Sequence, residues 1–206
     1  EVIPPQMVRF LMIKTEPNTA VEFNPFETQI IPKLYDDYQK ASIEYANKTG
    51  SDMARAFELS QIGDTQKVPE FRFLTLAQWV QMPNMDDEIK KEGLEDWAKY
   101  AKYWVDNFAP EKDKFEVKKE LPGEAKNLTD EQKNYLTALA DKLDFAKDAE
   151  EFQLEIYNSA KELELASKDA FAAIYLSLLG KDHGPKAAWL ILSLDSDFVK
   201  KRFQEV

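Results

Sequence analysis

Apolar residues recur at steps of three and four along the end of the chain, and this spacing constrains the fold more than any other feature. From residue 168 onward, the first such stripe comprises Ala170, Phe171, Ile174, Tyr175, Leu178 and Leu179. This is one face of an α-helix. Gly180 ends it, because glycine readily adopts the left-handed conformation that closes a helix.

Two further helices are predicted after that glycine. Gly184-Pro185 begins the first of them, and we expect the proline to lie in its first turn, where a missing N–H has no cost. Asp195 or Ser196 caps the last helix. Its pattern directs Phe198, Val199 and Phe203 inward and Lys200, Lys201 and Arg202 outward.

The helical spacing extends through most of the chain. Further helices are predicted at residues 4–14, 30–48, 53–61, 75–82, 93–108, 128–143 and 148–163, with a short acidic helix after residue 85. The last of these is expected to bury Phe152, Ile156, Tyr157 and Ala160. A brief extended segment is predicted only at residues 20–23. The fold class is therefore all-α, a bundle or cage of about ten helices in two subdomains.

Residues 109–127 interrupt this pattern. They contain Pro110, Pro122 and Gly123 among many charged residues and show no helical period. Proline and glycine are the residues that most often end regular structure. We expect this segment to be a connector or an extended tether between the two subdomains.

The composition provides few groups for catalysis or metal binding. The chain has no cysteine and one histidine, which excludes disulfides, zinc–thiolate sites and thiol nucleophiles. It has no glycine-rich phosphate loop and no paired histidine spacing, so neither a catalytic residue nor a metal site is predicted. No apolar run is long enough for a membrane span, and the first residues do not resemble a signal peptide. A cytoplasmic location is the default expectation.

The negative charge is unevenly distributed. The formal net charge is −11, and residues 51–166 hold 16 basic and 26 acidic side chains. Residues 167–206 hold 6 basic and 5 acidic side chains. Contacts with phosphate groups require local lysine and arginine. Any surface that faces RNA is therefore expected on the terminal helices rather than in the middle of the chain.

Three segments, in order, resemble class I lysyl-tRNA synthetases. They are PPQMVRFLMIKTEPNTAVEFNP near the start, Arg-Ala-Phe-Glu-Leu-Ser followed by Phe-Arg-x-Leu, and Leu-Leu-Gly-Lys-x-x-Gly-Pro-Lys followed by Leu-Asp-x-Asp-Phe-Val-x-x-Arg. In that family the first segment follows the ATP-binding signature loop. One departure is the sequence after Pro69, where Glu70 and Phe73 replace the expected Pro-Phe-Arg-His-Leu pattern, so no role is assigned to a histidine there.

The resemblance implies a domain organisation and a partner. Residues 1–50 would form a module that contacts the tRNA stem, residues 51–108 an anticodon-binding helix cage, residues 109–127 a linker and residues 128–206 a C-terminal helical subdomain. The implied partner is tRNA(Lys), with no DNA and no membrane. The catalytic domain, which would bind ATP, is expected to precede this chain, and no cofactor is expected within it.

The resemblance and the residue chemistry together give nine candidate RNA-binding residues: Arg72, Gln78, Trp79, Gln81, Lys181, His183, Lys186, Lys200 and Arg202. Aromatic rings can stack on unstacked bases, and Arg or Gln can bind base edges. Lysines and free N–H groups at a helix start can bind phosphate.

Each group of candidates also has a structural interpretation. Trp79 would belong to the core and Arg72 would pair with a nearby carboxylate. The turn around His183 would be an ordinary solvated turn, and the basic residues of the last helix would complement its dipole. At the level of the whole chain, the alternative to tRNA binding is an acidic all-α module that binds a basic protein and no RNA.

Overall fold

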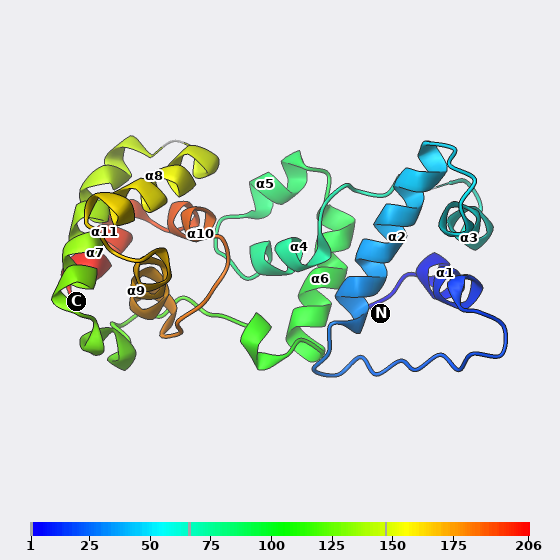
Figure 1. Ribbon diagram of the computed structural model, residues 1–206, viewed down its shortest axis with the longest axis horizontal. Helices are drawn as coiled ribbons and strands as arrows, with labels where there is room; N and C mark the ends of the chain where they lie inside the picture. The colour runs from blue at the N-terminus through cyan, green and yellow to red at the C-terminus, as the bar shows by residue number, and fades with distance from the viewer. Residues whose placement is uncertain (1, 66, 147) are drawn as a thin grey trace. The chain divides into compact units, whose positions relative to one another are not determined.

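The structure, a computed structural model, describes residues 2–65, 67–146 and 148–206. Within these ranges the regular structure consists of eleven α-helices and three short 3₁₀ helices, and no strand is present (Figure 1). The all-α prediction is therefore confirmed. The chain divides into two compact units, Glu1–Gln81 with Asp86–Lys114, and Met82–Met85 with Phe115–Val206.

The first unit contains six α-helices and a 3₁₀ turn among the described residues. They are α1 (Pro5–Lys14), α2 (Ile30–Ala46), α3 (Asp52–Ser60), α4 (Phe73–Trp79), α5 (Asp86–Lys91), α6 (Glu95–Asn107) and η1 (Glu111–Asp113). The brief extended segment predicted at residues 20–23 has no strand partner in the described chain.

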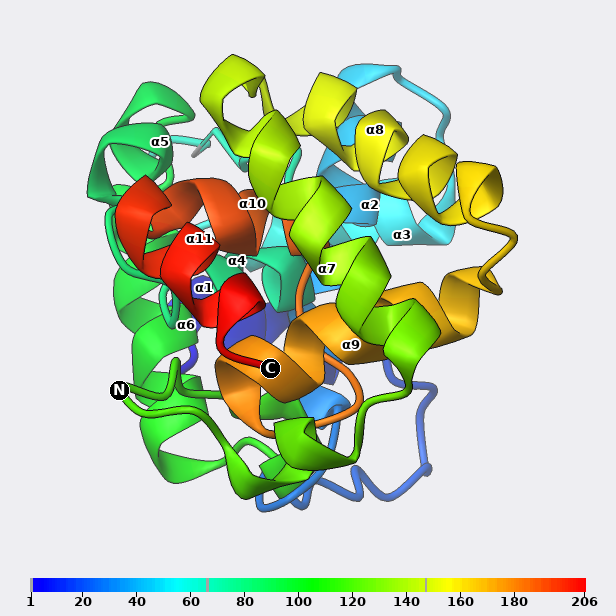
Figure 2. The same cartoon turned by 90° about the vertical axis from the view of Figure 1, so that its left-hand side faces the viewer.

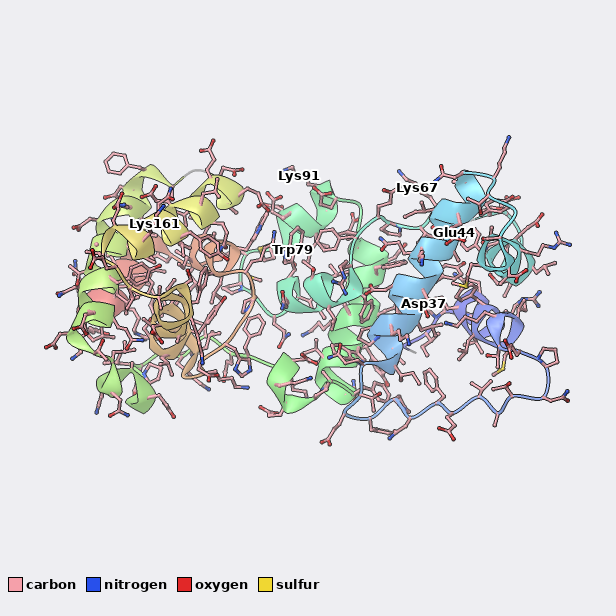
Figure 3. The ribbon with its side chains drawn as sticks, in the orientation of Figure 1. Asp37, Glu44, Lys67, Trp79, Lys91 and Lys161 are labelled. Atoms are coloured by element: carbon pink, nitrogen blue, oxygen red, sulfur yellow. The ribbon has the colours of Figure 1, made fainter. Side chains whose placement is uncertain are left out.

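Helix α2 is the centre of the first unit, because it packs against α1, α3 and α4. Its buried residues recur at helical spacing, as the sequence predicted: Ile31, Leu34, Tyr35, Tyr38 and Ala41. The Tyr35 ring stacks on Phe73 of α4 with 4.1 Å between ring centroids. On the α1 side, Lys14 forms an ion pair of 2.6 Å with Asp37, which is labelled on α2 in Figure 3. Aromatic packing thus fixes α4 against α2.

The second unit contains the remaining helices. They are η2 (Gly123–Asn127), α7 (Asp130–Lys142), η3 (Leu143–Phe145), α8 (Ala149–Glu162), α9 (Ser167–Leu179), α10 (Ala187–Ser193) and α11 (Ser196–Gln204). Helix α7 packs against α8, α9 and α11, and Figure 2 shows it in front of the viewer with α11 beside it. Side chains cap the starts of α7 and α8: Thr129 and Gln132 form a capping box on α7, and Asp148 caps α8.

The end of α9 confirms one prediction, and the next turn corrects another. Gly180 closes α9 in the left-handed conformation, with φ of 70°. Helix α10, however, begins only at Ala187, so Pro185 lies before its first turn. The reason is a tertiary contact: the hydroxyl of Tyr175 donates a hydrogen bond to the Pro185 carbonyl and holds this peptide outside the helix.

Two side chains point opposite to their predicted directions. Arg202 was expected to face outward, but it is buried, because its guanidinium finds backbone carbonyls inside the unit. Tyr157 was expected inside, but it is 47% exposed. Its ring packs on Phe171 with centroids 4.9 Å apart at the edge of the α8–α9 contact. Helical spacing predicts which face of a helix is buried but not how far the burial extends to the residues at the edge of that face. The burial predicted for Arg202 and Tyr157 was therefore wrong.

Residues 109–127 are tied down where they pass through the second unit. The Lys118 N–H donates to the Leu178 carbonyl at 2.9 Å, and a Cβ atom added to Gly180 would lie 3.2 Å from Pro122. The boundary between the two compact units falls within this segment, after Lys114.

Candidate nucleic-acid interface

In the first unit, helix α4 carries the candidates that the sequence places around residue 72. Arg72 lies at the N-terminal cap of α4, and its side chain is 70% exposed. One guanidinium nitrogen lies 3.2 Å from Asp36 Oδ2. The other oxygen of Asp36 accepts the Phe73 N–H at 3.2 Å. Asp36 therefore caps α4 from another helix while it orients Arg72.

Trp79 is part of the core rather than the surface. Its side chain is 5% exposed, and its ring packs at a tilt on Phe71 with 4.7 Å between centroids. A base could stack on Trp79 only if this packing opened. Figure 3 labels Trp79, the last residue of α4.

The two glutamine candidates lie on or just after the same helix and are half-buried. The Gln81 amide nitrogen donates to the carbonyls of Ala77 at 2.8 Å and Asp113 at 3.0 Å, so this donor supports the backbone. Gln78 lies near the end of α4, and its backbone carbonyl accepts the N–H of Gln81 at 3.1 Å. Of the four candidates on this part of the chain, Arg72 presents its polar group most openly.

A cavity of about 540 Å³ lies next to these residues, within the first unit. Its apolar lining consists of Val68, Pro69, Phe71 and Leu94, and its charged lining of Lys67, Glu70 and Glu92. Lys67 is labelled in Figure 3. This volume is within the range of small-molecule pockets, about 300–1,000 Å³. Phe71 was not among the predicted site residues, because a single phenylalanine before a helix carries no signal that distinguishes it from a core residue.

In the second unit, the turn between α9 and α10 carries Lys181, His183 and Lys186. A Cβ atom on Gly184 would lie 2.7 Å from Tyr175 Cδ1 and 2.8 Å from Leu179 Cδ1, so only glycine fits this close approach. Because the Pro185 carbonyl also accepts the Tyr175 hydroxyl, the turn is held firmly on α9. Burial raises the pKa of Tyr175 to about 12, which keeps this hydroxyl protonated as a donor.

The charged groups of this turn have acidic neighbours. His183 Nδ1 lies 2.6 Å from Asp182 Oδ1, and this hydrogen bond lowers the pKa of the Asp182 carboxyl. Lys186 forms an exposed ion pair of 3.0 Å with Glu150 of α8. Exposed ion pairs of this kind contribute little to stability, about 0–1 kcal/mol, so a phosphate could replace the carboxylate.

The two candidates on α11 lie in different environments. Lys200 forms an ion pair with Asp144 of η3 and stays partly accessible. Arg202 is 2% exposed, and its guanidinium donates to the carbonyls of Ser177 at 2.9 Å, Lys118 at 3.0 Å and Lys119 at 2.8 Å. Burial lowers the pKa of Arg202, although an arginine stays charged in proteins. Arg202 therefore presents no accessible donor to a phosphate.

Within residues 2–65, 67–146 and 148–206, no group of three or more His, Asp or Glu side chains is arranged to hold a metal ion. In the same residues, no helix is both long and apolar enough to cross a membrane.

Comparison with known proteins gives one consistent result. The lysine–tRNA ligase of Archaeoglobus fulgidus is 30% identical over 219 aligned residues, which cover 99% of this chain and 42% of the relative. The chain is homologous to lysine–tRNA ligases. The ligases of Methanosarcina barkeri, 26% identical over all of this chain, and Methanocaldococcus jannaschii, 28% identical over 97% of it, agree.

The homology extends along nearly the whole chain, and it confirms the resemblance read from the three ordered segments. No protein-family model matches the chain. The chain spans less than half the length of these lysine–tRNA ligases, 42% to 44%.

Proposed function

We propose that this chain is the tRNA-binding part of a class I lysyl-tRNA synthetase and that it contacts the inner stem and the anticodon of tRNA(Lys). The observation that carries this proposal is the alignment of nearly the whole chain with lysine–tRNA ligases about twice its length. On this proposal, lysine activation and ATP binding belong to a catalytic domain outside these 206 residues. The complete enzyme attaches lysine to tRNA in the cytoplasm.

The first unit supports the anticodon part of the proposal. Arg72 presents an exposed guanidinium beside a cavity whose lining includes the Phe71 ring. Proteins hold unstacked bases against aromatic rings and bind their edges with arginine. A base in this cavity would have apolar walls from Pro69 and Leu94, and Lys67 at the rim for a phosphate.

The second unit supports contact with the tRNA backbone. The turn between α9 and α10 holds Lys181, His183 and Lys186 on a rigid backbone, in the part of the chain with the least negative charge. Rigid presentation lowers the entropy lost when a ligand binds. The alternative function is an acidic module that binds a basic protein and no RNA. It is not favoured, since the homologues of this chain are named lysine–tRNA ligases.

A titration with RNA tests the proposal. Fluorescence anisotropy would follow binding of a tRNA(Lys) transcript and of transcripts with substituted anticodons, all at one salt concentration. We expect the substituted transcripts to bind more weakly. Equal binding of all transcripts would contradict anticodon recognition, and lysine-dependent pyrophosphate exchange by this chain alone would contradict the assignment of catalysis to another domain.

A pair of alanine variants makes the test specific. Arg72→Ala should weaken binding of the native transcript roughly tenfold or more, as expected for an arginine that contacts a base edge. Lys99→Ala is the control with the same change of charge, because Lys99 is also exposed and paired with a carboxylate, Asp96, at 2.8 Å. An equal effect of the two variants would remove Arg72 from the site.

A further inference from the structure

A second cavity, of about 330 Å³, lies in the second unit between the end of α7 and the first turns of α8. The Phe152 ring is part of its apolar lining and is 3% exposed. Phe145 also lines the cavity and is 82% exposed, the highest value among the exposed large apolar side chains of the described chain. Burial of such a ring by a ligand is favourable, because apolar surface leaves water.

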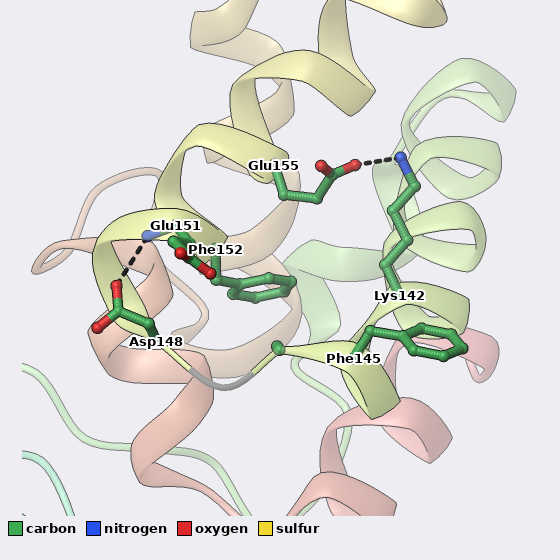
Figure 4. A pocket seen from close by; sticks show the side chains of 7 residues that line it. Lys142, Phe145, Asp148, Glu151, Phe152 and Glu155 are labelled. Atoms are coloured by element: carbon green, nitrogen blue, oxygen red, sulfur yellow. Dashed lines mark hydrogen bonds and ion pairs between the residues drawn. The ribbon is translucent and has the colours of Figure 1, made fainter.

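Carboxylates surround this apolar lining. Figure 4 shows Asp148 and Glu151 on one side of the Phe152 ring and Glu155 with Lys142 on the other. Asp148 Oδ1 accepts the N–H of Glu151 at 3.0 Å, which fixes the position of this carboxylate at the start of α8. The ion pair that the described residues form at this pocket joins Lys142 to Glu155 rather than to Glu151.

Lys142 does not neutralise the whole pocket. Its Nζ forms ion pairs with Glu155 and, at 3.4 Å, with Glu162, and donates to Ser159 Oγ at 2.9 Å. The hydrogen bond to Glu155 raises the pKa of Lys142. The ammonium group is therefore directed toward the later turns of α8, and the charges of Asp148 and Glu151 stay unbalanced by it.

We propose that this cavity binds an arginine side chain of a partner polypeptide. A guanidinium is planar, stacks on aromatic rings and forms two parallel hydrogen bonds to a carboxylate. Phe145, which lies across the pocket beside Lys142 in Figure 4, packs on the apolar stem of the arginine, and Glu151 with Asp148 supply the carboxylates for its guanidinium. The same carboxylates repel phosphate, which disfavours RNA as the occupant. None of the proposed RNA-binding residues lines this cavity, and the proposal does not depend on them.

The test uses the full chain and three short peptides with acetylated and amidated ends, Gly-Leu-Xaa-Leu-Gly, in which Xaa is arginine, lysine or citrulline. Citrulline has nearly the shape of arginine but no charge. Two-dimensional amide NMR would follow each titration. We expect the arginine peptide to shift resonances of residues 143–156, and the citrulline peptide to bind roughly threefold to tenfold more weakly, as loss of a partly exposed ion pair predicts.

Two variants and two controls locate the binding. Phe145→Ala and Glu151→Gln should each weaken binding of the arginine peptide, and both positions are exposed, so the fold should be kept. Leu154→Ala and Glu150→Gln are the controls, exposed residues of α8 outside the cavity lining. Equal binding of the arginine and citrulline peptides, shifts that map elsewhere, no binding at millimolar peptide, or displacement of the peptide by tRNA from this cavity would each overturn the proposal.

Discussion

At the scale of single residues, Arg202 has the largest structural role that the sequence did not indicate. Its guanidinium joins three segments, because it donates to one carbonyl at the end of α9 and to two in the segment before η2. It also stacks on Phe198, 4.9 Å from the ring centroid. Its Nε lies 3.6 Å from Glu205 Oε2, beyond hydrogen-bond distance. Arg202 therefore holds the connecting segment onto the second unit.

Replacement of Arg202 should destabilise the protein. Arg202→Ala is expected to lower the free energy of unfolding by about 2–4 kcal/mol, since buried carbonyls lose charged donors and the aliphatic stem leaves a cavity. Urea unfolding followed by circular dichroism would measure this. Lys201→Ala, one position earlier and exposed, is the control and should change stability by about 0.5 kcal/mol or less. A similar small effect for both variants would show that the Arg202 contacts add little.

Ionisation of Tyr175 makes the stability of the second unit depend on pH in the alkaline range. Burial raises the pKa of Tyr175 in the folded protein to about 12 from an ordinary value of 10.0. The stability from the protonated hydroxyl is complete below pH 10 and is lost as the pH rises through about 12, because the unfolded chain releases the proton more readily. Burial raises the pKa of Tyr135 in the same direction.

The expected result is a free energy of unfolding that decreases by about 2 kcal/mol or more between pH 10 and pH 12. Urea unfolding at several pH values, together with tyrosinate absorbance, would measure it. Tyr175→Phe should reduce the steepness of this decrease. If the variant and the original chain lose stability in parallel, ionisation of Tyr175 is not linked to folding.

At the scale of the elements, helix starts in the second unit depend on side-chain caps. On α7, the Thr129 hydroxyl accepts the Gln132 N–H at 3.3 Å, and the Gln132 side chain accepts the Thr129 N–H at 3.0 Å. These two bonds satisfy donors that have no partner within the helix. Because α7 packs against three other helices, a weaker start of α7 affects the whole unit.

Thr129→Ala is therefore expected to lower the free energy of unfolding by about 1 kcal/mol. Thr137→Ala is the matched control. Thr137 is exposed at a middle position of α7, and its hydroxyl donates a hydrogen bond to the Lys133 carbonyl of the same helix. Alanine at this position should therefore be neutral or slightly stabilising. Thermal unfolding of both variants checks the prediction. Equal destabilisation by the two changes would contradict a role for the cap.

At the scale of the whole molecule, charge governs the proposed interaction with RNA. The net charge of −11 opposes nucleic acid at long range, and local lysines must supply the attraction. Salt screens both effects, and the number of phosphate contacts determines how steeply affinity falls with salt. The salt dependence of tRNA binding therefore reports which lysines make these contacts.

The double variant Lys181→Ala/Lys186→Ala should flatten the plot of log affinity against log salt concentration by roughly 0.7–0.9 for each lysine that contacts a phosphate. Lys99→Ala/Lys102→Ala is the control with the same change of charge, on exposed positions of α6. Titrations with tRNA(Lys) at several salt concentrations would measure both slopes. Equal changes in the two double variants would assign the effect to net charge rather than to the turn between α9 and α10.

Most helices of this protein could be predicted from the order of its residues, because helix formation depends on local spacing and on caps. The end of α9 at Gly180 and the Asp195 cap of α11 are both present, as predicted. The relationship to lysine–tRNA ligases could also be predicted, because three segments resemble that family in the same order.

The environment of each candidate residue needed the tertiary structure. The spacing on α11 placed Arg202 outside, yet carbonyls from two distant segments bind it inside. The conformational preference of proline predicted Pro185 in the first turn of α10, but a hydrogen bond from Tyr175 holds the Pro185 carbonyl outside that helix. The sequence by itself determined two properties of this protein: its all-helical fold class and its relationship to lysine–tRNA ligases. Only the tertiary structure decided which polar groups stay accessible, because burial depends on contacts between residues far apart in the chain.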